Sequence, residues 1–274
     1  MKCQSVMRSS ATPCLSVSRR ASANFLMSLR SDNAARRGPG TVRRGPFGSA
    51  ILVFCVIVSP AFAAGRGVSF RAEDGRTINA MVFEPSQRPA PAVVLVPMLG
   101  RPKDDWDAVG QRLADANILA LAIDLPGVSD PGDSKILGAW SADVRASVSY
   151  LSSRPDVRPG GVGIAGASLG ASLAALAASD LPAVRSLALI SPSLDYRGVR
   201  IEAAMKQYGG RPALLVASSH DPYAARTVRE LAKDPPGTRE TRVSETTAHG
   251  TMLLARDPDL VRTLVEWFQT TLSR

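Results

Sequence analysis

Ser168 is the residue of this chain whose neighbours most clearly point to chemistry. It lies in GIAGASLGAS (163–172), with Gly166 and Gly170 two residues away on either side. A serine hydroxyl is a poor nucleophile at neutral pH and needs a base to take its proton. It must also stand clear of the sheet, which a sharp strand-to-helix turn between glycines achieves. The pattern predicts a nucleophile, and the alternative is an incidental turn residue in a Gly/Ala-rich helix start.

An acid follows the serine in the chain. Asp221 lies in SSHDP, in the loop after an apolar strand expected at 211–218. A carboxylate there could hold the tautomer of a catalytic base. The residue could also simply cap a helix whose first position is Pro222, and both roles are compatible. Asp195, which follows the preceding strand, is the competing acid.

The base is expected at His249, on the glycine-flanked loop TTAHGT after the last strand. Only His220 competes, because the chain has two histidines. His220 adjoins Asp221, and neighbouring side chains on an extended segment point apart. His220 is therefore interpreted as a loop residue, and the order Ser168, Asp221, His249 is that of a serine hydrolase on an α/β sheet.

The elements that must position these residues alternate between short apolar strands and amphipathic helices. Such alternation predicts an α/β fold, with a mostly parallel central sheet and helices on both faces. Ligands of such sheets bind at the carboxyl ends of the strands, where the three candidates lie. Strands are expected at 67–72, 77–85, 91–97, 118–124, 161–166, 184–191, 211–218 and 238–245, and helices at 104–116, 141–153, 169–179, 221–234 and from 257 onward.

These motifs make nearly all of residues 66–274 resemble the α/β-hydrolase superfamily, particularly its small, dienelactone-hydrolase-like members. The resemblance rests on GIAGASLG, VLVPMLGRPKDDW, LAIDLPG, SSHDP and AHGT. It implies a serine esterase that cleaves carboxylic ester bonds of a small-molecule or acyl substrate through a Ser168-Asp221-His249 triad. It implies no metal and no cofactor. The stretch 191–210 is too short for a large cap, so little or no cap domain is expected.

One departure from the family concerns the oxyanion hole. The family often carries His-Gly after the strand segment VVLV (93–96), whereas this chain has Pro97-Met98 and then Leu99. Backbone N–H groups can serve whatever the side chain, so Leu169 N–H is expected as the first donor and Leu99 N–H as the second. Met98 N–H would replace Leu99 if the loop is shifted. Met98 and Leu99 could also be plain apolar lining.

Other functions remain open on these residues. A serine peptidase or an acyltransferase would use the same fold and triad. A different class is a non-catalytic binding domain, tethered to a membrane by residues 50–64, which the Pro97-Met98 departure motivates. The intact set of serine, aspartate and histidine argues against that class.

The net charge of +9 is concentrated in the first 63 residues. This segment holds nine of the 33 Lys and Arg residues and one of the 24 acidic ones, which leaves 24 basic and 23 acidic residues in 64–274. A nearly neutral domain is not typical of a nucleic-acid binder, so that class is excluded.

Residues 1–63 read as a targeting segment ahead of a hydrolase domain at 64–274. A basic stretch precedes the apolar run at 50–58, and AFA follows at 61–63, as in a signal peptide cleaved after Ala63. A secreted or periplasmic protein is therefore expected, with an anchor at 50–64 as the alternative and translation starting at Met1, Met7 or Met27. All three cysteines lie in this segment, so residues 64–274 have neither disulfides nor cysteine metal sites.

Overall fold

The computed structural model describes residues 65–127, 132–233, 237 and 239–273. The predicted targeting segment at 1–63, including its three cysteines, lies outside the described residues. The predicted signal cleavage and the alternative anchor at 50–64 therefore remain predictions.

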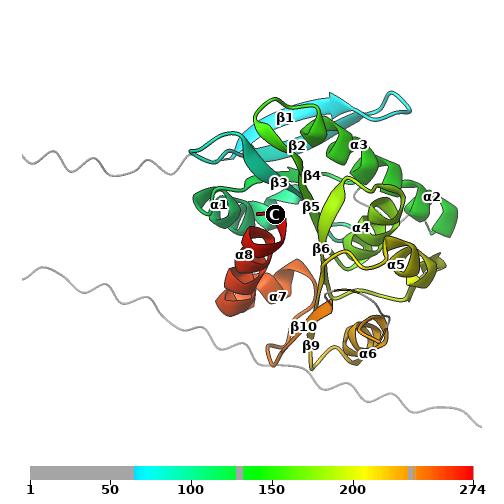
Figure 1. The fold of residues 1–274 in the computed structure, drawn as a ribbon. Helices are drawn as coiled ribbons and strands as arrows, with labels where there is room; N and C mark the ends of the chain where they lie inside the picture. The colour runs from blue at the N-terminus through cyan, green and yellow to red at the C-terminus, as the bar shows by residue number, and fades with distance from the viewer. Residues whose placement is uncertain (1–64, 128–131, 234–236, 238, 274) are drawn as a thin grey trace, which may run out of the picture. The chain divides into compact units, whose positions relative to one another are not determined.

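An eight-stranded sheet forms the centre of the described domain (Figure 1). Its strands are β1 (Arg66–Arg71), β2 (Thr77–Phe83), β3 (Ala90–Val96), β4 (Leu119–Ile123), β5 (Val157–Ala167), β6 (Val184–Ile190), β9 (Ala213–Ser218) and β10 (Arg239–Ser244). The spatial order is β1-β2-β4-β3-β5-β6-β9-β10. The opening hairpin β1–β2 is antiparallel and the other six strands run parallel, so the predicted mostly parallel sheet is confirmed.

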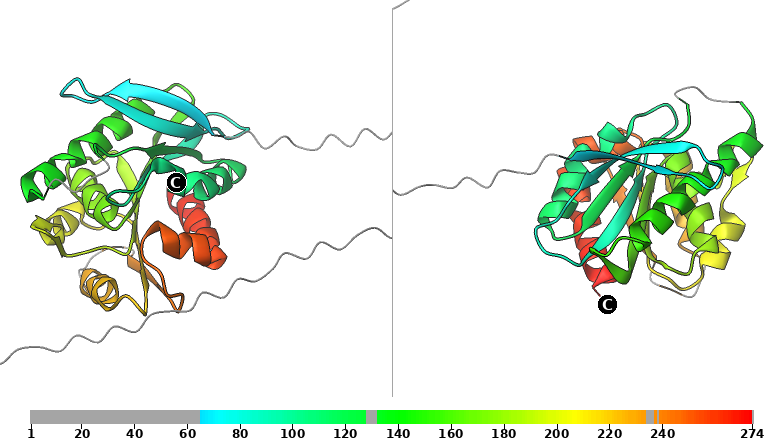
Figure 2. Two further views of the ribbon diagram at one scale, coloured as in Figure 1. Left: turned by 180° about the vertical axis from the view of Figure 1, so that it is seen from behind. Right: turned by 90° about the horizontal axis from the view of Figure 1, so that it is seen from above.

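Helices cover both faces of this sheet (Figures 1 and 2). They are η1 (Lys103–Trp106), α1 (Asp107–Asp115), α2 (Ser134–Ala139), α3 (Ser141–Ser152), α4 (Leu169–Asp180), α5 (Glu202–Tyr208), α6 (Pro222–Leu231), α7 (Thr251–Arg256) and α8 (Pro258–Leu272). Helices α2 to α6 pack on one face, while η1, α1, α7 and α8 pack on the other. In β3, Val94 and Val96 face the first layer and Val93 and Leu95 face the second. Burial on both faces explains why β3, β4, β6 and β9 are nearly continuous apolar runs, whereas the edge strand β10 is polar and partly exposed.

The stretch 191–210 forms more structure than the sequence analysis assigned to it. It holds a two-stranded hairpin, β7 (Asp195–Tyr196) and β8 (Val199–Arg200), followed by α5. Met205 and Tyr208 of α5 are buried in the core that α4 also lines, so α5 belongs to the helix layer. Among the described residues, this stretch builds no cap domain over the sheet.

The strand order reverses at β3, which is where a ligand crevice is expected in a sheet of this kind. The chain passes from β3 to β4 on one side and then returns to β5 on the other side of β3. Open α/β sheets bind their ligands where the strand order reverses in this way, at the carboxyl ends of the strands. The loop that begins at Pro97 leaves β3 there, and Ser168 follows β5 at the same edge.

Candidate active site

Ser168 occupies the sharp turn between β5 and α4. Its φ of 53° and ψ of −118° are angles that L residues rarely adopt. Its N–H donates to the carbonyl of Ile190 at 2.9 Å, and its own carbonyl accepts from Ala171 N–H at 3.0 Å. These bonds on both sides hold the strained residue in place.

The two glycines of the motif are required by close approach of the backbone. A Cβ atom on Gly166 would collide with the Gly170 carbonyl group, and one on Gly170 would lie 2.5 Å from the Val96 carbonyl oxygen. Gly170 also lies against the carbonyl of Pro97. The start of α4 is therefore pressed directly against the end of β3, which brings the elbow and the next loop together.

We expect Gly170→Ala to destabilise the protein by more than the roughly 1–3 kcal/mol of an ordinary overpacked site. The added methyl group meets backbone carbonyls of a central strand, which no side-chain rearrangement can clear. Urea unfolding of the purified variant measures the effect. Gly138→Ala in α2 is the matched control, because a Cβ there meets nothing within 4 Å. That control should be neutral or stabilising by up to about 1 kcal/mol, and equal urea midpoints for both variants would contradict the close-approach argument.

His249 connects Ser168 to Asp221. Its Nε2 lies 2.8 Å from Ser168 Oγ, and its Nδ1 lies 2.5 Å from Asp221 Oδ2. Because an ionised carboxylate only accepts hydrogen bonds, Nδ1 carries the ring proton and Nε2 accepts from the serine hydroxyl. In this arrangement an imidazole can take the proton of an attacking serine.

Asp221 has two tasks at once. It is the N-cap of α6, where its Oδ1 accepts from Ala224 N–H at 3.1 Å ahead of Pro222. Its other carboxylate oxygen binds His249. The capping role and the role of histidine partner, which the sequence leaves side by side, are thus compatible in the structure.

The two competitors named from the sequence are bonded elsewhere. Asp195 accepts from Gly198 N–H at 2.6 Å and from Arg200 Nε at 2.8 Å. Arg200 and then the Gly198 N–H hold the pKa of Asp195 below its usual range. His220 is exposed, with Nδ1 at 3.2 Å from Ser219 Oγ. Neither residue has a hydrogen bond to Ser168 or His249 in the described structure.

The backbone groups expected to form an oxyanion hole lie on adjoining segments. Leu169 is the first residue of α4, so its N–H has no partner within the helix. Within the described residues, no acceptor is bonded to the N–H groups of Leu169, Met98 or Leu99. The contact between Gly170 and Pro97 sets the loop of Met98 and Leu99 beside the serine turn. The side chains of Met98 and Leu99 are partly buried against the two cores, so the apolar-lining role is also present.

Ser191 is a site residue that the sequence analysis did not single out. Its Oγ accepts from Gly250 N–H at 2.9 Å, directly beside His249. It is 1% exposed, has a φ of 49°, and donates its own N–H to Val216. Ser191 directly follows β6, as Ser168 follows β5, and this position after a strand was the available signal.

Ser168 and His249 open onto a cleft of about 340 Å³. Its other walls include Pro192, Tyr196, Arg197 and Tyr223, from the hairpin region and the start of α6. Tyr223 OH donates to the Asp195 carbonyl at 3.1 Å, which ties α6 to the hairpin. The cleft combines apolar, aromatic and cationic surface and has room for a small organic molecule.

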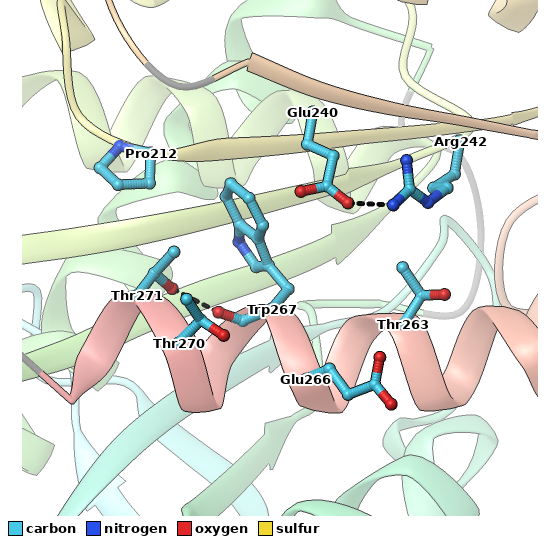
Figure 3. A pocket seen from close by; sticks show the side chains of 8 residues that line it. All are labelled: Pro212, Glu240, Arg242, Thr263, Glu266, Trp267, Thr270 and Thr271. Atoms are coloured by element: carbon cyan, nitrogen blue, oxygen red, sulfur yellow. Dashed lines mark hydrogen bonds and ion pairs between the residues drawn. The ribbon is translucent and has the colours of Figure 1, made fainter.

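A second hollow, of about 330 Å³, lies between β10 and α8 (Figure 3). Glu240 and Arg242 of β10 pair with each other there, and Trp267 Nε1 donates to the Leu187 carbonyl at 3.2 Å. Pro212, at the amino end of β9, also lines it, so it lies away from the carboxyl ends of the strands. It contains no histidine and is not the site of the chemistry above.

The described residues lack a metal-binding cluster and a membrane-spanning helix. No cluster of three or more His, Cys, Asp or Glu side chains is arranged to hold a metal ion there. No helix in the same residues has the length and apolar character needed to cross a membrane.

Comparisons with known proteins agree with this fold. The chain is 26% identical to carboxymethylenebutenolidase of Pseudomonas putida over 185 residues, which is 60% of this chain and 75% of that protein. The structure of DcsB in complex with its substrate analogue aligns with a TM-score of 0.68 at 13% identity, over 77% of this chain and 100% of that one. Dienelactone hydrolase from Anabaena variabilis aligns with a TM-score of 0.61 at 17% identity, over 76% and 97%. Residues 93–272, well over half of the chain, match the model of the alpha/beta hydrolase family. The protein therefore belongs to the alpha/beta hydrolase family and is a dienelactone-hydrolase-like hydrolase, as the motifs predicted.

Proposed function

We propose that the protein hydrolyses carboxylic esters through a covalent acyl-enzyme on Ser168. The observation that carries this proposal is the continuous chain from Ser168 Oγ through His249 to Asp221, with 2.8 and 2.5 Å contacts at the mouth of a cleft. The name of the Pseudomonas putida relative contains butenolide, a cyclic ester, and so favours an ester as the scissile bond.

In the proposed mechanism, Ser168 Oγ attacks the acyl carbonyl while His249 Nε2 takes its proton. Asp221 holds Nδ1 protonated and stabilises the imidazolium that forms. The same imidazolium then donates its proton to the leaving alkoxide. In the second half of the reaction His249 takes a proton from water, the water oxygen attacks the acyl carbonyl, and the proton returns to Ser168 Oγ as the acid is released. Leu169 N–H and either Leu99 or Met98 N–H stabilise the tetrahedral oxyanion, because these groups have no competing acceptor in the described structure.

Covalent labelling tests the proposal directly. Treatment with a fluorophosphonate probe should modify one site, and mass spectrometry of the digested protein should place the label on Ser168. The same preparation should hydrolyse short-chain p-nitrophenyl esters. No labelling and no turnover would overturn the enzyme proposal in favour of a binding domain. Labelling of Ser168 with negligible ester turnover would instead favour a peptidase or an acyltransferase.

We also propose that residues 1–63 direct the protein out of the cytoplasm and are removed after Ala63. Cleavage there would leave the described fold intact, because β1 begins at Arg66. N-terminal sequencing of the exported protein should then begin at Ala64. A mature protein that begins at Met1 or Met27 would contradict the cleavage and favour the anchor.

A further inference from the structure

The loop after β3 and the loop before α7 are joined by one carboxylate. Asp105 of η1 accepts from Thr251 Oγ1 at 2.9 Å, only two residues beyond His249. It also accepts from Arg101 through both carboxylate oxygens, with Nε at 2.7 Å and Nη2 at 2.8 Å. Arg101 N–H in turn donates to the Met98 carbonyl at 3.2 Å. A path of hydrogen bonds therefore runs from the histidine loop to the segment of Met98 and Leu99.

Direct packing joins the same two loops. A Cβ atom on Gly250 would collide with the sulfur of Met98 and lie 3.0 Å from its Cγ. Gly250 has a φ of 59°, an angle that glycine adopts without strain. The Met98 side chain can therefore lie directly on the residue that follows His249.

Asp105 is a mostly buried carboxylate that is fully engaged in hydrogen bonds, unlike a charge on the surface. Its side chain is 14% exposed, and Thr251 is 2% exposed. Hydrogen bonding from Arg101 lowers the pKa of Asp105, so the carboxylate stays an acceptor at neutral pH. The neighbouring Asp104 side chain is 60% exposed, and within the described residues its carboxylate pairs with Lys103 Nζ alone, at 3.4 Å. The two aspartates lie in the same helix turn, but Asp105 binds Arg101 and Thr251 whereas Asp104 pairs with Lys103.

The His249 side chain itself is 49% exposed, so its position depends on the anchoring of its loop. We propose that Asp105 is a positioning residue that fixes the histidine loop against the loop of the second oxyanion donor. The inference rests on the proposed function of those groups. Through Thr251 it sets the distance from His249 to Ser168, and through Arg101 it sets the placement of the Met98 and Leu99 N–H groups. A displacement of about 1 Å in such groups costs about 100-fold in rate.

Steady-state kinetics on a short-chain ester test the positioning role. Asp105→Ala should lower kcat about 10- to 100-fold while KM stays within about twofold, because the cleft walls are untouched. Asp105→Asn should recover part of the loss, since an amide oxygen in the place of Oδ2 can still accept from Arg101 Nε and Thr251 Oγ1, while the bond from Arg101 Nη2 to Oδ1 is lost. Asp104→Ala is the matched control and should leave both constants unchanged. The proposal is overturned if Asp105→Ala behaves like Asp104→Ala, or if it acts through KM alone.

Hydrogen exchange supplies a readout that does not depend on activity. Asp105→Ala should speed amide exchange in both peptides that cover 97–102 and 246–253. Thr251→Val, which keeps the Arg101–Asp105 pair, should speed exchange only in 246–253. Faster exchange in only one peptide of Asp105→Ala, or equal changes across the whole domain, would show that Asp105 does not join the two loops. If the protein lacked ester turnover altogether, these exchange patterns would still decide the link between the loops.

Discussion

Replacing Ser168 by alanine is expected to lower kcat for ester hydrolysis by roughly a factor of 10⁶ while the protein stays folded. Among the described residues, Ser168 Oγ is the one oxygen bonded to His249 Nε2, so the change leaves the base no proton to take. The turn itself depends on backbone bonds from Ser168 N–H and C=O, which alanine keeps. A p-nitrophenyl ester assay and far-UV circular dichroism measure the two effects. Retained turnover in this variant would show that another group is the nucleophile.

Ser168→Gly tests the strain at the turn separately from the chemistry. It should be equally inactive, but about 1 kcal/mol more stable than Ser168→Ala, because glycine adopts the positive φ without a Cβ clash. Urea midpoints of the two inactive variants give the comparison. Since neither variant has a nucleophile, a difference between them reports only the backbone. Identical midpoints would mean that the turn stores no strain.

The fold and the serine, aspartate and histidine positions could be predicted because their signals are local. Strands β3, β4, β6 and β9 are apolar runs, and Ser168 directly follows β5. Asp221 and His249 lie in the loops that follow β9 and β10. Ser191 carries the same local signal, because it directly follows β6. Helix α5 could also have been predicted, because its buried side chains repeat at helical spacing from Ile201 to Tyr208. Helix α7 has only six residues, too few for such a repeat to be recognised.

The bond between Asp105 and Thr251 could not be predicted, because the two residues are 146 positions apart. Nothing local distinguishes Asp105 from Asp104, since both are acidic residues in the same first turn. Their difference arises only when α7 packs against η1. Which apolar side chains of the final helix, α8, are buried also depends on how it packs. In α8, Val261 and Val265 are apolar but only partly buried, whereas Trp267 and Leu272 are buried.

Asp221→Asn is expected to lower kcat by about 10⁴ with little change in stability. The wild-type carboxylate accepts two hydrogen bonds, one from Ala224 N–H and one from His249 Nδ1–H. Asparagine offers one acceptor oxygen and turns its NH₂ group toward the other donor. The backbone N–H at the start of α6 is fixed and cannot change its role. The exposed histidine ring can change tautomer, so the amide oxygen should keep the cap and the NH₂ group should face Nδ1.

In that tautomer Nε2 carries the proton and cannot accept from Ser168, which is why the rate falls while α6 keeps its cap. The opposite orientation would keep the histidine tautomer, lose the cap, and cost about 1 kcal/mol of stability. Parallel measurements of kcat and the urea midpoint therefore distinguish the two orientations. Asp257→Asn is the matched control, because Asp257 caps α8 ahead of Pro258 in the same way. It should leave kcat unchanged, and an equal loss in both variants would mean that Asp221 acts through the helix rather than through His249.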